Sequence, residues 1–81
     1  MDTKIALIGI LVRDWNSTDD LNRVLHDYSQ YIIGRMGIPY KPKNANVISV
    51  ALDAPQDIIN ALAGKIGRIP GLTTKTISSE N

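Results

Sequence analysis

The chain has 81 residues, no cysteine, and nine Lys and Arg against eight Asp and Glu, which gives a net charge of +1. This length predicts one domain spanning residues 1–81, and the lack of cysteine excludes a disulfide framework and a thiolate metal site. The nearly balanced charge does not fit direct nucleic-acid binding. No stretch of roughly 18 apolar residues is present, and charged residues flank the first apolar run, so we expect no membrane span, no signal peptide and a cytoplasmic protein.

Residues 4–13 predict the first strand, with apolar side chains on both of its faces. One face carries Ile5, Leu7 and Leu11, and the other carries Ala6, Ile8, Ile10 and Val12. A strand that is apolar on both faces lies inside a sheet and has to be covered on both sides. Gly9 interrupts the run, and we expect a bulge or a close backbone contact there.

Residues 18–29 predict an amphipathic helix, because their apolar side chains recur at intervals of three and four residues. Ser17 or Asn16 is expected to cap its first turn, and Ser17 with Asp20 approximates a capping box. His26 is expected on the solvent side of this helix. The buried stripe comprises Leu21, Val24, Leu25 and Tyr28.

Residues 31–38 predict a second strand, followed by a polar turn that contains Pro39 and residues 40–44. Arg35 stands between Gly34 and Gly37 in this strand, and interior glycines often mark a bulge or a close backbone approach. The prolines cannot donate ladder hydrogen bonds, so this end of the strand is expected at an edge or in a loop.

Residues 46–53 predict a third strand and residues 72–78 a fourth, with a helix between them. Asp53 is expected to cap that helix, and Gly67 is expected to end it in a left-handed conformation. Pro70 and Gly71 form a turn, and residues 79–81 form a tail. The third strand has a strongly apolar face of Ile48, Val50 and Leu52 and a smaller face of Val47, Ser49 and Ala51, and the helix stripe is Ile58, Ile59, Leu62 and Ile66.

The order βαββαβ predicts an α+β, ferredoxin-like fold, with an antiparallel sheet whose middle strands are the first and the third. Two helices cover only one face of such a sheet. The other face would then be an exposed apolar patch of the kind that marks interfaces. We therefore expect a homo-oligomer, a dimer or a tetramer, in which the open sheet face packs against another copy.

The residue content offers little for catalysis or for metal binding. There is no cysteine and only one histidine, His26, so we expect no catalytic residues, no metal site within one chain and no cofactor. A metal site could still assemble with one His26 from each of several copies, and carboxylates together with water remain an alternative for a hard cation. Arg35 is the strongest candidate for a binding residue, as a carboxylate- or phosphate-binding group at a cleft between subunits. The alternatives are an ion pair at an interface and an exposed charge that protects an edge strand from aggregation.

Three segments carry a resemblance to a known family: ALIGILV at residues 6–12, YIIGRMGIPY at residues 31–40, and VISVALDAPQDIINALAGKIGRIPG at residues 47–71. Together they resemble the iron-only hydrogenase system regulators, small bacterial proteins with a fold like that of the ACT domain and of the C-terminal domain of nickel-responsive regulators. The resemblance implies a cytoplasmic, oligomeric, regulatory protein. The ACT-like comparison also implies a ligand site near the first strand–helix turn, at residues 9–16.

The leading functional hypothesis is a non-enzymatic regulatory domain that binds a small molecule as a homo-oligomer, linked to maturation or transcriptional regulation of iron-only hydrogenase. Its expected ligand-binding residues are Arg35, Arg13 and Asn16. One alternative is a protein-interaction module that docks on a hydrogenase maturation factor. The other is a metal-responsive assembly built around His26.

Overall fold

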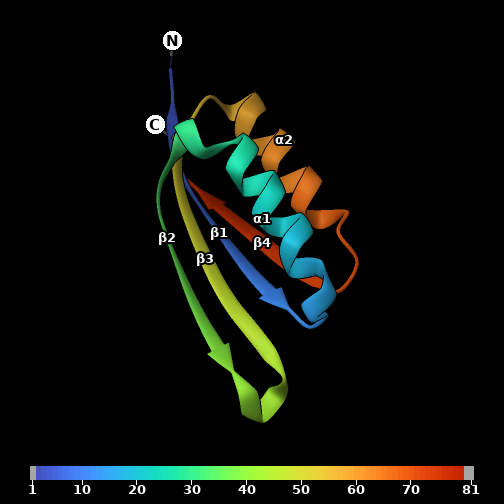
Figure 1. The fold of residues 1–81 in the computed structure, drawn as a ribbon. Helices are drawn as coiled ribbons and strands as arrows, with labels where there is room; N and C mark the ends of the chain where they lie inside the picture. The colour runs from blue at the N-terminus through green and yellow to red at the C-terminus, as the bar shows by residue number, and fades with distance from the viewer. Residues whose placement is uncertain (1, 80–81) are drawn as a thin grey trace.

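A computed structural model describes residues 2–79. It has the ferredoxin-like βαββαβ order, with three short 3-10 helices in the connections, and Figure 1 shows both α-helices on the same side of the sheet. Among residues 2–79, neither helix has the length and apolar character needed to cross a bilayer. The main elements are β1 (Lys4–Val12), α1 (Thr18–Asp27), β2 (Ile32–Tyr40), β3 (Ala45–Ala54), α2 (Gln56–Gly67) and β4 (Leu72–Ser78).

The four strands form one antiparallel sheet in the order β2-β3-β1-β4. The two strands with apolar residues on both faces, β1 and β3, are therefore the central ones, as the sequence predicts. Every residue of β1 pairs with β3, from Lys4 opposite Ala54 to Val12 opposite Asn46. The outer strands β2 and β4 are the edges.

The helices cover one face of the sheet, which we call the helix face, and the core lies between them and that face. Its side chains come from alternate positions of β1 and β3 and from one side of each helix. Ile8 and Leu62 are both fully buried, with 0% exposure. The core residues include Ala6, Ile8, Ile10 and Val12 of β1, Ile48, Val50 and Leu52 of β3, Leu21 and Leu25 of α1, and Ile59, Leu62 and Ile66 of α2.

The opposite side of the sheet, which we call the open face, carries no covering element among residues 2–79. Its apolar side chains are exposed, from 37% for Leu11 to 70% for Ile77. The register places them on all four strands. They are Ile5, Leu7 and Leu11 of β1, Met36 and Ile38 of β2, Val47 of β3 and Ile77 of β4.

Three expectations about helix ends are wrong. Ser17 precedes α1 but makes no capping bond, because its buried hydroxyl donates to the carbonyl of Pro70. Asp53 is exposed within β3, and Pro55 stands at the start of α2 without a side-chain cap. The left-handed glycine is Gly71, with φ of +81°, and not Gly67.

Gly71 cannot carry a side chain, because an added Cβ would collide with the Cβ of Asp14. This close approach holds the turn after α2 against the turn after β1, where Arg13 N donates to Gly71 O over 2.9 Å. Gly9, by contrast, sits in regular pairing with Ser49 and Lys75, so the bulge or close contact expected there is wrong.

The element boundaries differ from the predicted ones mainly around β2. Strand β2 runs on through Pro39 to Tyr40, which an edge strand permits because a proline there need not donate to a neighbour. Helix α1 ends at Asp27, and a 3-10 turn at Ser29–Tyr31 follows it. Of the predicted tail, residues 80 and 81 lie outside the described residues, whereas Ser79 N donates to Ile5 O over 2.9 Å.

Candidate functional site

A β-bulge decides which face of the sheet Arg35 reaches. Ile32 pairs with Leu52 and Gly34 pairs with Ala51, so Ile33 is an extra residue in β2. Without it, strict alternation from Ile32 would place Arg35 on the open face. The bulge instead sets Arg35 opposite the buried Val50, on the helix face, as bulges do when they re-aim a side chain.

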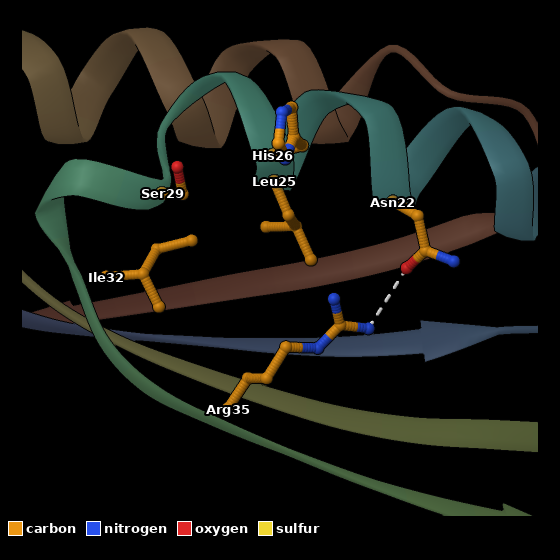
Figure 2. A pocket seen from close by; sticks show the side chains of 6 residues that line it. All are labelled: Asn22, Leu25, His26, Ser29, Ile32 and Arg35. Carbon is orange, nitrogen blue, oxygen red and sulfur yellow. Dashed lines mark hydrogen bonds between the residues drawn. The ribbon is translucent and has the colours of Figure 1, made fainter.

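Arg35 lines a pocket between α1 and the edge strand β2, with a volume of about 310 Å³. Figure 2 shows Arg35 and Asn22 pointing toward one another, while Leu25 and Ile32 extend into the space between the helix and the sheet. His26 and Ser29 complete the helix side of the pocket. The site thus combines the guanidinium of Arg35 with amide, hydroxyl and imidazole groups and an apolar floor.

Arg35 Nη2 donates to Asn22 Oδ1 over 3.1 Å, and this is its one hydrogen bond to another residue within 2–79. The ion pair found among these residues joins Arg23 to Asp20 at 3.4 Å, so no carboxylate neutralises Arg35. A guanidinium offers five N–H donors in a fixed fork. Arg35 is therefore held at one nitrogen and keeps donors for a planar anion.

The other two predicted binding residues lie elsewhere. Arg35 is level with Val50 and Ile8 across the sheet, and Arg13 is five positions beyond Ile8, roughly 17 Å along the strand direction. Arg13 and Asn16 belong to the turn after β1, where Asn16 N donates to Asp14 Oδ1 over 3.0 Å. The structure does not bring these two residues together with Arg35, and their roles stay predictions.

His26 lies on the exposed side of α1, as predicted, and joins the Arg35 pocket. Within residues 2–79, no three His, Cys, Asp or Glu side chains come close enough to hold a metal ion. The positive Arg35 guanidinium lines the same pocket as His26, and it would repel a bound metal cation. The pocket therefore suits an anion better than a metal cation.

Sequence reasoning missed four residues of this pocket: Asn22, Leu25 as a lining residue, Ser29 and Ile32. A signal for the polar ones is present. Asn22, His26 and Ser29 are spaced by four and three residues, which places them on one side of a helix. The sequence does not show that these residues lie close to Arg35, because that depends on how the chain folds.

The open face has a hollow of its own at Gly9, with a volume of about 330 Å³. Leu11, Val47 and Thr73 border it together with Ser49 and Lys75. The missing side chain of Gly9 makes this depression in the central strand, and a Cβ added there would meet only Lys75 O at 3.9 Å. Its lining suits an apolar side chain from another molecule.

These features define a small ferredoxin-like domain with an uncovered apolar sheet face and a cationic pocket on its other side. A family model described as "Iron-only hydrogenase system regulator, putative" matches residues 4–76. The chain belongs to this family, the TM1266-like proteins. No curated protein matches the sequence.

Among solved structures, the TM1266 protein of Thermotoga maritima is 30% identical and superposes with a TM-score of 0.92, covering 98% of this chain and 100% of the other. A formyltetrahydrofolate deformylase from Pseudomonas putida KT2440 is similar over 95% of this chain and 30% of its own, with 14% identity and a TM-score of 0.68. The designed protein Foldit4 is similar over 99% of both chains, with 12% identity and a TM-score of 0.64. The last two share the fold alone.

Proposed function

We propose that the chain is a non-enzymatic regulatory domain of the iron-only hydrogenase system that works in the cytoplasm as a homo-oligomer and binds a small molecule. The observation that carries the proposal is the open face. Seven exposed apolar side chains on four adjacent strands are more than a monomer normally leaves in water.

The bulge in β2 supports burial of the open face. Unbroken alternation would have placed Arg35 on that face, whereas the bulge brings Met36 and Ile38 there and turns Arg35 to the other side. A charge buried without a partner is costly at an interface. The bulge thus removes a cation from the surface that the proposal buries.

A second copy of the chain is the proposed occupant, because the two charges on the open face are of opposite sign. Asp53 pairs with Ile5 and Lys75 pairs with Gly9, on opposite sides of β1, so the point midway between them falls at Leu7. A two-fold axis that lies between two facing sheets over Leu7, perpendicular to the line from Asp53 to Lys75, would bring each Lys75 over the partner's Asp53. Isologous contacts of this kind are the commonest in homodimers.

The size of the open face fits an association that depends on concentration. Four strands of about nine residues cover roughly 600 Å². A standard interface buries about 800 Å² on each partner. The packed sheets, about 10 Å apart, would leave both helix layers outside, with their Arg35 pockets open to solvent.

This arrangement disfavours the metal-responsive alternative. His26 belongs to α1, so a dimer that packs sheet against sheet would hold the two copies of His26 on opposite outer surfaces. The protein-interaction alternative uses the same open face, with a hydrogenase maturation factor as its occupant. The two alternatives predict different results for the pure protein. A homo-oligomer has a multiple of the chain's mass, whereas a chain that waits for a maturation factor has the mass of a monomer.

Native mass spectrometry of protein purified without a metal-affinity tag tests the proposal, because it weighs the assembly and any retained ligand together. The proposal expects a dimer or a tetramer, with additional mass when a ligand stays bound. A pure protein that is a monomer at every concentration would remove the homo-oligomer from the proposal. It would leave the open face to a different protein.

A further inference from the structure

We propose that the pocket between α1 and β2 binds a small carboxylate that has a short apolar chain and no ammonium group, with Arg35 holding the carboxylate. The inference rests on the proposed ligand-binding role and names the ligand class. The ligand pocket lies on the helix side of the sheet, whereas the proposed homo-oligomer uses the open face. The two proposals can therefore fail independently.

The charge in the pocket calls for an anion. Arg35 has no carboxylate partner among residues 2–79, and its hydrogen bond to Asn22 uses one nitrogen of the guanidinium. Figure 2 shows the guanidinium turned from β2 toward α1, into the space beneath Leu25. Two parallel N–H donors of a guanidinium match the two oxygens of a carboxylate.

The apolar floor of the pocket favours an anion that also carries a hydrocarbon chain. Leu25 is a core residue with 2% exposure, and Ile32 packs against the same core. Both line the pocket beside the guanidinium. Inorganic phosphate has no apolar surface to place against them, whereas a carboxylate with a short alkyl chain fills both parts of the site.

The lack of an acidic side chain in the pocket argues against an amino acid as the ligand. None of the six lining residues is Asp or Glu, and the Asn22 oxygen already accepts from Arg35. An ammonium group would therefore lose water without gaining an anionic partner, and it would lie near the positive Arg35. The volume of about 310 Å³ is at the lower end for ligand pockets, which fits a small ligand.

An NMR titration of ¹⁵N-labelled protein with butyrate, 2-aminobutanoate and inorganic phosphate, each added separately, tests the assignment. We expect butyrate to shift the amide signals of α1 and β2 around Asn22 and Arg35. 2-Aminobutanoate keeps the carbon chain and the carboxylate of butyrate but adds an ammonium group, whereas phosphate is an anion without a carbon chain. We expect each of them to bind at least ~10-fold more weakly.

Substitutions distinguish butyrate binding in the pocket from a general effect of the protein's charge on binding. Arg35→Gln should weaken butyrate binding by at least ~10-fold, and Arg35→Lys should restore only part of it, because an ammonium cannot hold both oxygens in the same way. Arg23→Gln is the matched control, since Arg23 is an exposed arginine of α1 that pairs with Asp20 and does not line the pocket. It should leave butyrate binding unchanged.

The inference is overturned if butyrate causes no shifts, if Arg35→Gln binds butyrate as the wild type does, or if phosphate or 2-aminobutanoate binds as tightly as butyrate. Aggregation of Arg35→Gln with unchanged butyrate binding would likewise overturn it and assign Arg35 to edge protection. A stable homo-oligomer that ignores butyrate would contradict this inference alone. A monomer that binds butyrate would contradict only the oligomer in the proposed function.

Discussion

The helix face and the open face of the sheet are made from alternate residues of the same strands, yet the chain covers only one of them. Leu7 and Ile8 are neighbours in β1, and their exposures are 43% and 0%. Apolar composition does not separate the two faces, because both carry Ile, Leu and Val. The difference shows that an apolar strand pattern alone does not tell which face is buried within one protomer.

The polar residues follow the same division. The bulge at Ile33 turns Arg35 to the helix face and leaves Met36 and Ile38 on the open face. One local irregularity therefore gives the helix side a cationic pocket and the other side a more uniformly apolar surface. The four predictions that follow test this division, from the largest expected effect to the smallest.

Ile8→Ala should lower the free energy of unfolding by roughly 2–5 kcal/mol, because it leaves a cavity in the fully buried core. Leu7→Ala should cost well under half as much in the dissociated protomer, since Leu7 is exposed there. Urea unfolding at a protein concentration below the association range compares the two. Equal costs for the two neighbours would contradict the division between the faces.

Leu7→Lys should weaken self-association by roughly 3 kcal/mol, or about a hundredfold, because it buries an unpaired charge near the centre of the open face. Size-exclusion chromatography with light scattering measures the change in mass. Asn60→Lys adds the same charge at an exposed position of α2 and should leave the assembly intact. Loss of the oligomer in both variants would indicate that net charge, and not the open face, controls self-association.

Gly9→Val should leave the protomer as stable as before, because a Cβ at Gly9 meets only Lys75 O at an ordinary distance and valine suits a strand. It should weaken association by ~1–3 kcal/mol by filling the hollow on the open face. Gly37→Val is the control, since Gly37 lies opposite Ile48 and its Cβ would also have ordinary room. Unchanged association of Gly9→Val would mean that the hollow stays outside the interface.

Ser17→Ala should cost about 1 kcal/mol of unfolding free energy, because the buried hydroxyl donates to Pro70 O and so ties the start of α1 to the turn before β4. Urea unfolding of the dissociated protomer measures it. The oligomer should be unaffected, because the bond lies away from the open face. A stability equal to the wild type would show that this bond does not secure the helix layer.

The sequence was sufficient for the order of elements, the central places of β1 and β3, and the apolar open face, because each depends on alternation along one strand. It misplaced the helix caps because those depend on contacts between distant segments. Ser17 reaches Pro70, and Gly71 lies against Asp14, far apart in the chain. No local pattern around either residue reveals its partner.

The candidate pocket was only partly predictable for a similar reason. The unusual setting of Arg35 between two glycines drew attention to it, but the face it reaches depends on one extra residue in β2. Arg13 and Asn16 were grouped with it by resemblance, whereas the register separates them from Arg35 along the sheet. Asn22 belongs to the site because α1 lies beside β2 in the folded chain, as Figure 2 shows.

The central claim is that the open face joins copies of this chain. Sedimentation equilibrium of the wild type over a range of concentrations, beside Leu7→Lys, tests it most directly. The account predicts a dimer or a tetramer that dissociates on dilution in the wild type, and a folded monomer in Leu7→Lys at the same concentrations. A wild-type monomer throughout, or an oligomer that Leu7→Lys leaves unchanged, would contradict it.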